Sequence, residues 1–274
     1  MMVVQVKKVG KMRVFWELAI LAFQRQLAYR SAHLAGLVTN FFFGLLRAAV
    51  IIALYGAREE VAGYTVMMAI TFTGLSQAMI GHLSLFSWSD VMRSIYSGEI
   101  ASDLLKPMGF FSYWLAQDAG RALAAFLMRS VTIMFAYAIF FNITIPKKIE
   151  SWAALVAALF LSWLVSFSWR FLVNLAAFWT PNAIGIARLL FGFSWVLSGF
   201  FMPLNYFPNW FQQIAYATPF PSMIFTVIQV YLENLSGFQL LQALMSQVLW
   251  FFILLALIQV VLRAGIRQLV VQGG

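Results

Sequence analysis

The sequence predicts an all-α membrane protein with six transmembrane helices. Three observations lead to this fold class. The 274 residues are 63% hydrophobic and only 10% charged, whereas a soluble domain carries about 25% charged residues. Apolar stretches of about 20 residues, the length of a helix that crosses a bilayer, recur along the chain. One long polar interruption, residues 87–108, divides these stretches into two blocks and must lie in water on one side of the membrane.

The composition also limits the chemistry of the chain. It contains no cysteine, which excludes disulfides, thiol chemistry and thiolate metal sites. The formal net charge of +9 fits membrane topology better than binding to nucleic acid, because Lys and Arg accumulate on cytoplasmic loops. The basic N-terminus lacks the short apolar core and small-residue cleavage site of a signal peptide, so no cleaved leader is expected.

Residues 1–31 are predicted to form a cytoplasmic or interfacial lead to the first span. Positions 12–30 have the periodicity of an amphipathic helix, and its apolar face contains Phe15, Leu18, Ala19, Ala22 and Phe23. Such a helix can lie in the headgroup layer. It can equally be a helical extension of the first span, and the sequence leaves both interpretations open.

The first apolar block, residues 34–86, contains two spans. In the first, 34–55, Arg47 lies roughly 12 Å from the outer end at 1.5 Å per residue. Its side chain either faces the bundle or a wet pathway, or snorkels outward. The second span, 61–86, is unusually polar and includes His82, which we interpret as a packed or pore-lining residue rather than a ligand.

The polar segment 87–108 is predicted to hold two short helices across the end of the bundle. One face of the first helix repeats apolar residues at helical spacing: Val91, Met92, Ile95 and Tyr96. Gly98 marks its end, because glycine tolerates the left-handed conformation at a helix C-terminus. A second helix over 99–105 stops before Pro107, which disfavours a helical residue ahead of it. One face of this unit is expected to be free for a partner.

The second apolar block begins with three spans, residues 110–202. We interpret the third as an interfacial lead, 110–121, followed by the span itself, 123–141. The fourth span covers 152–179 and the fifth covers 183–202.

Charged residues interrupt the third and fourth spans. Asp118 lies one helical turn from Arg121, which predicts a local ion pair near the cytoplasmic end. A charge at the bilayer centre costs about 2.5–3.5 kcal/mol on insertion scales. Snorkelling toward the cytoplasmic ends of the spans is expected to relieve that cost for Arg129 and Arg170.

Gly185, Gly192 and Gly199 fall seven residues apart in the fifth span. That spacing drifts only slightly around a helix, so the glycines form a smooth stripe where another helix can approach closely. The stripe predicts either an interface with a second subunit or packing within one subunit, and the pattern does not separate the two.

Residues 203–239 are predicted to form an extracellular re-entrant helical hairpin before the last span. The stretch 203–221 has four prolines, several aromatics and no charge. Proline cannot donate a backbone hydrogen bond, and a continuous lipid-facing helix here would leave carbonyls unpaired. Residues 222–232 return as a short helix, the last span covers 240–262, and 263–274 form a tail.

Six spans place both termini on the side of the polar segment. The Lys and Arg residues assigned to that side are Lys7, Lys8, Lys11, Arg13, Arg25, Arg30, Arg93, Lys106, Arg263 and Arg267. The opposite side holds Arg58, Lys147 and Lys148. Because positive residues accumulate on cytoplasmic loops, both termini are predicted to be cytoplasmic.

The sequence contains no recognisable catalytic motif. It has no GxxxxGK[ST] phosphate loop, no HExxH, no GxSxG and no acidic metal cluster. No catalytic residue, metal ligand or bound cofactor is therefore predicted for the chain itself. Its spans also hold few carboxylates, the groups with which proton- or sodium-coupled carriers work.

Three local patterns resemble the permease subunits of bacterial type-2 ABC exporters. Residues 97–108, SGEIASDLLKPM, look like the G-(x)n-LL-(K/R)-P pattern after that family's coupling helix. Residues 197–221, LSGFFMPLNYFPNWFQQIAYATPFP, are similar to its proline-rich extracellular region before the last span. The ending RQLVVQGG, 267–274, is similar to the basic Gly-Gly tail of one bacterial subgroup.

The resemblance covers nearly the whole chain and implies a single permease domain, 1–274, in the bacterial inner membrane. The chain would form half of a translocation pathway, and a second permease subunit, identical or different, would form the other half. A separate cytoplasmic ABC ATPase would carry ATP and Mg²⁺, so the chain itself would not be an enzyme. The residues expected at the ATPase interface are Asp90, Val91, Met92, Arg93, Ile95, Tyr96, Glu99 and Asp103, with Ile95 and Tyr96 as anchors.

Two other function classes stay open at this point. A secondary transporter is the first alternative, and internal inverted repeats would support it. A membrane scaffold or insertase-like protein without transport activity is the second. Under the exporter interpretation, Arg47 and the three glycines belong to the translocation pathway or the dimer interface.

Overall fold

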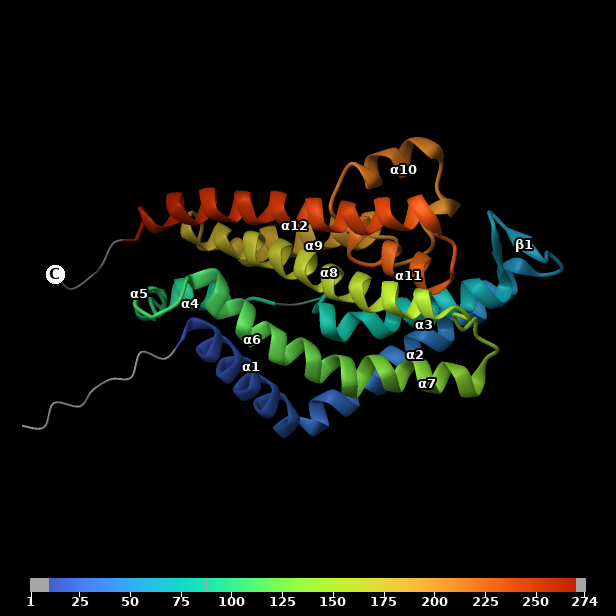
Figure 1. Cartoon of the computed structure of the whole chain (residues 1–274), viewed down its shortest axis with the longest axis horizontal. Helices are drawn as coiled ribbons and strands as arrows, with labels where there is room; N and C mark the ends of the chain where they lie inside the picture. The colour runs from blue at the N-terminus through green and yellow to red at the C-terminus, as the bar shows by residue number, and fades with distance from the viewer. Residues whose placement is uncertain (1–9, 87, 270–274) are drawn as a thin grey trace, which may run out of the picture.

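The computed structural model describes residues 10–86 and 88–269 and consists almost entirely of helices (Figure 1). Five helices are long and apolar enough to cross a membrane: Ser31–Tyr55, Val66–Leu83, Phe110–Phe140, Ile149–Phe178 and Gly237–Ile266. An all-α membrane protein is thereby confirmed. The fifth predicted span corresponds to a shorter apolar helix, Ala183–Leu197. Expectations about residues 1–9, 87 and 270–274 lie outside the described residues.

The elements are named in chain order. The α-helices are α1 (Lys11–Ala28), α2 (Arg30–Tyr55), α3 (Val66–Leu83), α4 (Asp90–Tyr96), α5 (Ile100–Leu104), α6 (Phe110–Ala125), α7 (Val131–Phe140), α8 (Ile149–Asn174), α9 (Ala183–Leu197), α10 (Asn209–Tyr216), α11 (Phe225–Tyr231) and α12 (Gly237–Ile266). The shorter elements are strands β1 (Glu60–Val61) and β2 (Tyr64–Thr65), the π-helix η1 (Phe126–Ser130), and the 3-10 helices η2 (Leu175–Phe178), η3 (Leu204–Tyr206) and η4 (Phe220–Ser222).

Helix α1 is a separate helix and not a straight extension of the first span. The backbone at Tyr29, with φ −92° and ψ 48°, breaks the helix between α1 and α2. The α1 helix packs along α6 (Figure 1), with Ala19 and Ala22 buried in the contact. A Cβ atom at Gly120 of α6 would lie 2.7 Å from the backbone nitrogen of Phe23, so this approach requires glycine. The apolar face predicted for α1 is the face that meets α6.

A β-hairpin precedes the second span, which therefore starts later than position 61. Strands β1 and β2 pair antiparallel through a two-residue turn, Ala62 and Gly63, with φ of 50° and 84°. Two positive φ values are the mark of the type I′ turn that suits tight hairpins. The helix α3 then begins after Thr65, whose Oγ1 accepts a hydrogen bond from the Met68 nitrogen at 3.3 Å.

Helix α3 is the centre of the bundle, and its residues from 69 to 83 are all buried. Its hydroxyl groups donate hydrogen bonds to carbonyls of the same helix: Thr71 to the Met67 carbonyl at 2.7 Å and Thr73 to the Ala69 carbonyl at 3.0 Å. These bonds satisfy polar groups in a setting without water. The second predicted span can be this polar because protein rather than lipid surrounds its helix.

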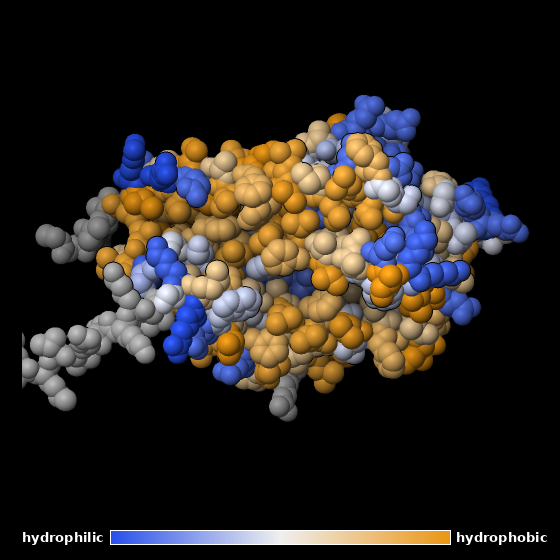
Figure 2. Space-filling model, viewed as in Figure 1, coloured by the Kyte–Doolittle hydropathy of each residue, from blue (hydrophilic) through white to orange (hydrophobic). Residues whose placement is uncertain are grey.

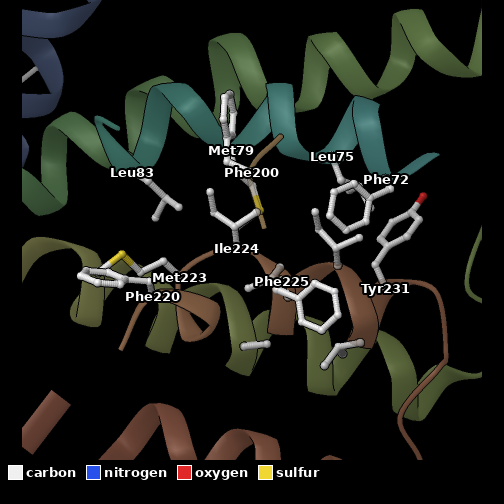
Figure 3. Close-up of a cluster of buried hydrophobic side chains, with 14 of the residues drawn as sticks. Phe72, Leu75, Met79, Leu83, Phe200, Phe220, Met223, Ile224, Phe225 and Tyr231 are labelled. Carbon is white, nitrogen blue, oxygen red and sulfur yellow. The ribbon is translucent and has the colours of Figure 1, made fainter. Parts of the chain in front are cut away.

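The largest hydrophobic cluster joins α3 to the segment η4–α11 (Figure 3). Side chains of α3 on one side meet side chains of the segment from η4 to the start of α11 on the other: Phe72, Leu75, Met79 and Leu83 against Phe220, Met223, Ile224 and Phe225. Lipid tails are as apolar as these groups, so close packing rather than exclusion of water stabilises the contact.

The third predicted span is one continuous helix, and the division into a lead and a span is wrong. α6, η1 and α7 follow one another without interruption over Phe110–Phe140. At 1.5 Å per residue this helix is about 46 Å long, more than the ~30 Å hydrocarbon layer. The π-helical turn η1 contains Arg129, whose guanidinium group lies against Gly36 and Gly81.

Two short helices, α10 and α11, lie in the region before the last long helix, α12. Pro208 precedes α10, and Pro219 and Pro221 separate it from α11. α10 lies at the edge of the bundle, whereas α11 is inserted among the long helices and its residues are largely buried (Figure 1).

The two ends of the bundle differ. The start of α1, the α4–α5 segment and the end of α12 lie at one end, and the β-hairpin and the α7–α8 loop lie at the other (Figure 1). Both described chain ends are therefore on the side of the predicted polar segment. Figure 2 shows an apolar surface across the middle and hydrophilic residues gathered toward the two ends, the pattern of a membrane-spanning body.

Candidate functional site

The α4–α5 segment forms a cap on one end of the bundle (Figure 1). As predicted, Gly98 separates the two helices, with φ +78°. Val91, Met92 and Ser94 of α4 and Ile100 of α5 are buried. They pack against α8 and η2, where Val91 joins Phe171 and Leu175 in one cluster and Met92 joins Val173 in another. The apolar face of α4 is therefore used inside the chain.

Asn174 of α8 fixes α4 to the bundle through its side-chain amide. Its oxygen accepts a hydrogen bond from the Met92 nitrogen at 3.1 Å. Its nitrogen donates to the Trp88 carbonyl at 2.9 Å and to the Arg170 carbonyl at 2.8 Å. One buried side chain thus connects the start of α4 to α8.

Tyr96 makes a second connection, to the start of α9. Its hydroxyl donates to the Thr180 carbonyl at 2.8 Å and accepts from the Ala183 nitrogen at 3.0 Å. The Ala183 N–H is one of the unpaired donors at the start of α9, so Tyr96 acts as a cap from another helix. Although 43% of Tyr96 is exposed, its hydroxyl is committed to this contact.

Asp103 closes the α4–α5 turn from within. Its carboxylate accepts from the Ser94 hydroxyl at 2.7 Å and from the Lys106 ammonium at 2.5 Å. The Lys106 ammonium also lies 3.4 Å from the centre of the Tyr113 ring. Partial burial opposes the charge of Lys106, but its bonds to Asp103 and Tyr113 outweigh that effect and raise its pKa.

The surface that remains free on this segment is smaller than predicted. Among the eight residues expected at a partner interface, Val91, Met92 and Asp103 are buried within the chain. Asp90 and Arg93 form an exposed ion pair at 2.9 Å, Ile95 is half-buried, and Tyr96 and Glu99 are exposed. Sequence reasoning missed Leu105, which is 87% exposed, because the pattern placed it at the end of a helix and not on a face.

A buried charge cluster lies deeper in the bundle, where α6 meets α8. Asp118 accepts hydrogen bonds from Arg121 at 2.7 Å, from Arg170 at 2.9 Å and from the Trp163 indole at 2.8 Å. Arg121 also donates to the carbonyls at the end of α3, those of Gly81 and His82. The local Asp118–Arg121 ion pair is confirmed.

Arg170 does not snorkel, contrary to expectation. Its side chain is 2% exposed and its guanidinium group is paired with Asp118 and lies 5.1 Å from the centre of the Trp88 ring. Arg170 lies one helical turn before Asn174. The charge cluster and the residue that attaches α4 to the bundle therefore lie on the same stretch of α8. This stretch is a continuous polar connection from the bundle interior to the α4–α5 cap.

Arg47 faces the bundle rather than lipid. Its guanidinium group donates to the Ser76 hydroxyl at 3.1 Å, to the Phe200 carbonyl at 2.8 Å and to the Phe201 carbonyl at 2.6 Å. These carbonyls follow the end of α9, where helical partners are missing. Arg47 therefore ties α2 and α3 to the turn after α9.

The three glycines of the predicted stripe separate into two roles. Gly199 lies beyond the end of α9 with φ +75°, a left-handed conformation that ends the helix. Gly185 and Gly192 remain on the helix surface, and a Cβ at Gly192 would meet no atom within 4 Å. Within the described residues the face of α9 at Gly192 has no helix packed on it.

Glu233 links two loops at the opposite end of the bundle. Its carboxylate accepts hydrogen bonds from the Ser151 hydroxyl at 2.7 Å and from the backbone nitrogens of Lys148 and Lys147 at 3.0 and 3.1 Å. The Ser151 bond, the backbone bonds and the Lys148 charge together lower the pKa of Glu233. In residues 10–86 and 88–269 no group of three or more acidic or histidine side chains is arranged to hold a metal ion.

Comparison with known proteins gives one family match. The model of a family described as ABC-2 family transporter protein matches residues 41–273. The matched region begins within α2, spans the α4–α5 cap and reaches past the end of α12. No curated protein shows significant similarity to the chain.

Proposed function

Because the chain belongs to the ABC-2 transporter family and is a permease subunit, we propose that it forms half of the pathway of a bacterial ABC exporter. In this proposal a separate cytoplasmic ATPase docks on the α4–α5 cap and drives transport. The observation that carries the proposal is this cap: a short helical unit held to α8 and α9 by hydrogen bonds, with a polar face left free.

The docking surface consists of exposed and half-buried residues of the cap: Asp90, Arg93, Ile95, Tyr96, Glu99 and Leu105. Leu105 supplies the apolar anchor, since a few apolar or aromatic residues seated in pockets dominate interface energies. Arg93 and Glu99 orient the partner at the rim, where charges contribute more to specificity and association rate than to affinity. ATP and Mg²⁺ belong to the partner.

Motion passes from the cap into the membrane through two attachments. Asn174 joins α4 to α8, and Tyr96 joins α4 to the start of α9. A displacement of the cap therefore displaces α8 and α9 as one unit. Closure of the ATPase partners would reach the pathway by this route.

The second permease subunit, identical or different, packs on the open face of α9. Gly185 and Gly192 leave room for close approach of a helix, and Leu189 and Phe193 beside them are more than half exposed. Arg47 holds the outer end of α9 in place for this contact. α10 and α11, as a re-entrant hairpin, close the pathway at the outer leaflet.

The chain is oriented with both termini in the cytoplasm of the inner membrane. The α4–α5 end carries Lys11, Arg13, Arg93, Lys106, Arg263 and Arg267, against Arg58, Lys147 and Lys148 at the hairpin end. An excess of positive residues on one side favours the cytoplasm for that side.

The proposal is tested by reconstituting the permease with the ABC ATPase with which it co-purifies, in proteoliposomes. ATP hydrolysis should require both chains and should fall when Leu105→Glu removes the anchor, while a matched Leu54→Glu variant, exposed at the other end, keeps activity. A permease that drives transport from an ion gradient without any ATPase would favour the secondary transporter instead.

A further inference from the structure

A groove of about 490 Å³ opens between α1, α6 and α8, within the roughly 300–1,000 Å³ range of ligand pockets. Trp16 and Ile20 of α1, Leu123 of α6, and Phe160 and Trp163 of α8 give it an almost wholly apolar lining. Figure 2 shows a hollow in the middle of the visible face, within the apolar part of the surface. The groove therefore opens on the apolar part of the surface, which faces lipid rather than water.

His82 of α3 reaches the groove from the interior and carries an unpaired nitrogen. The residue is 4% exposed, and its Nδ1 lies 3.1 Å from the Ser130 Oγ. Its Nε2 is buried and has no hydrogen-bond partner among residues 10–86 and 88–269. Buried side-chain polar atoms are nearly always paired, so Nε2 stands out as a nitrogen whose hydrogen-bonding capacity the described residues do not use.

The neighbours of His82 determine which kind of group Nε2 can bind. The Ser130 hydroxyl donates to the Ala78 carbonyl at 2.6 Å, so the Ser130 oxygen can only accept from Nδ1. In the neutral ring Nδ1 then carries the proton and Nε2 is an acceptor. Arg121 donates to the His82 carbonyl at 2.8 Å, and its positive charge makes the site unfavourable for a cationic donor. The group that suits Nε2 is therefore a neutral hydrogen-bond donor.

We propose that this groove binds a single-chain amphiphile whose alkyl chain lies against α1, α6 and α8 and whose hydroxyl group donates to Nε2 of His82. An apolar cavity with one polar atom is the arrangement by which ligand sites fix the orientation of a mainly apolar molecule. The site lies in the permease itself, so it does not depend on the ATPase partner.

The proposal is tested with the purified permease in lipid nanodiscs and a photoreactive hexadecanol that carries a diazirine in its chain. The matched probe is the methyl ether of the same molecule, which has no donor. Illumination followed by peptide mass spectrometry should place the alcohol on α1, α6 and α8, and the ether should label these helices about five- to tenfold less, the effect of one hydrogen bond.

Two variants distinguish recognition of the hydroxyl group by His82 from simple occupation of the groove by an alkyl chain. His82→Phe keeps a ring beside Phe126 but removes the acceptor, and should lower labelling by the alcohol to the level of the ether. Leu123→Trp fills the groove from its exposed edge and should abolish labelling by both probes. Equal labelling of the wild-type groove by alcohol and ether, or labelling only elsewhere, would overturn the proposal and leave the groove as a place for ordinary lipid chains.

Discussion

Replacing Asp118 by Asn tests the buried charge cluster most severely. Asp118 is fully buried and is the only carboxylate that the described residues bring to Arg121 and Arg170. The cluster now holds two positive charges and one negative charge, and Asp118→Asn would leave two positive charges with none. Removing one partner of a buried ion pair costs about 3–5 kcal/mol, because the remaining charge keeps its desolvation penalty. We expect a loss of unfolding free energy of that size.

The assay is reversible unfolding of the permease in mixed micelles, followed as SDS is increased. Asp90→Asn is the matched control, because it breaks the exposed Asp90–Arg93 pair, and exposed pairs contribute about 0–1 kcal/mol. The double variant Asp118→Asn with Arg170→Gln should lose less than the sum of the single variants, since it removes one of the uncompensated charges. A loss below about 1 kcal/mol for Asp118→Asn would refute the assignment of this cluster as a buried structural unit.

Four further predictions follow from named contacts. Tyr96→Phe keeps the ring but removes the bonds to the α9 start, so ATPase binding should persist while the ratio of transport to ATP hydrolysis falls severalfold. Gly192→Leu fills open space and should leave the monomer folded but weaken assembly of the permease pair, as measured by light scattering; unchanged assembly would place the interface elsewhere. The lowered pKa of Glu233 means that its stabilising effect is complete above about pH 4.5, its ordinary value, and is lost as pH falls through the folded-state pKa; Glu233→Gln should remove this pH dependence of the melting temperature. In intact cells an impermeant thiol reagent should label Gly56→Cys and not Ser97→Cys, and the reverse result would invert the orientation.

Local sequence patterns were sufficient to predict the helices and turns that depend only on neighbouring residues. The spacing of apolar residues predicted α4, and Gly98 and Pro107 predicted the limits of the α4–α5 unit, because φ preference and proline geometry act within a few residues. The same pattern could not say that the apolar face of α4 is covered by α8. An amphipathic helix shows that one face is buried, without showing what buries it.

The errors arise where distant residues meet. Asp118 and Arg121 suggested an interfacial lead because charge in an apolar stretch usually seeks water. Their partner Arg170 is 52 positions from Asp118, and no local signal connects them. Arg170 and Asn174 stand one turn apart in an apolar helix, which is the one pattern that could have indicated an inward-facing polar stripe.

The central claim is that the α4–α5 cap receives the ATPase, and site-specific photocrosslinking tests it most directly. A benzoylphenylalanine residue at Leu105, which is 87% exposed, should form a crosslink with the ATPase chain in the purified, reconstituted complex. The same residue at Leu54, 72% exposed at the opposite end, should not. A complex that hydrolyses ATP normally but gives no crosslink at Leu105, or gives one at Leu54, would contradict the claim.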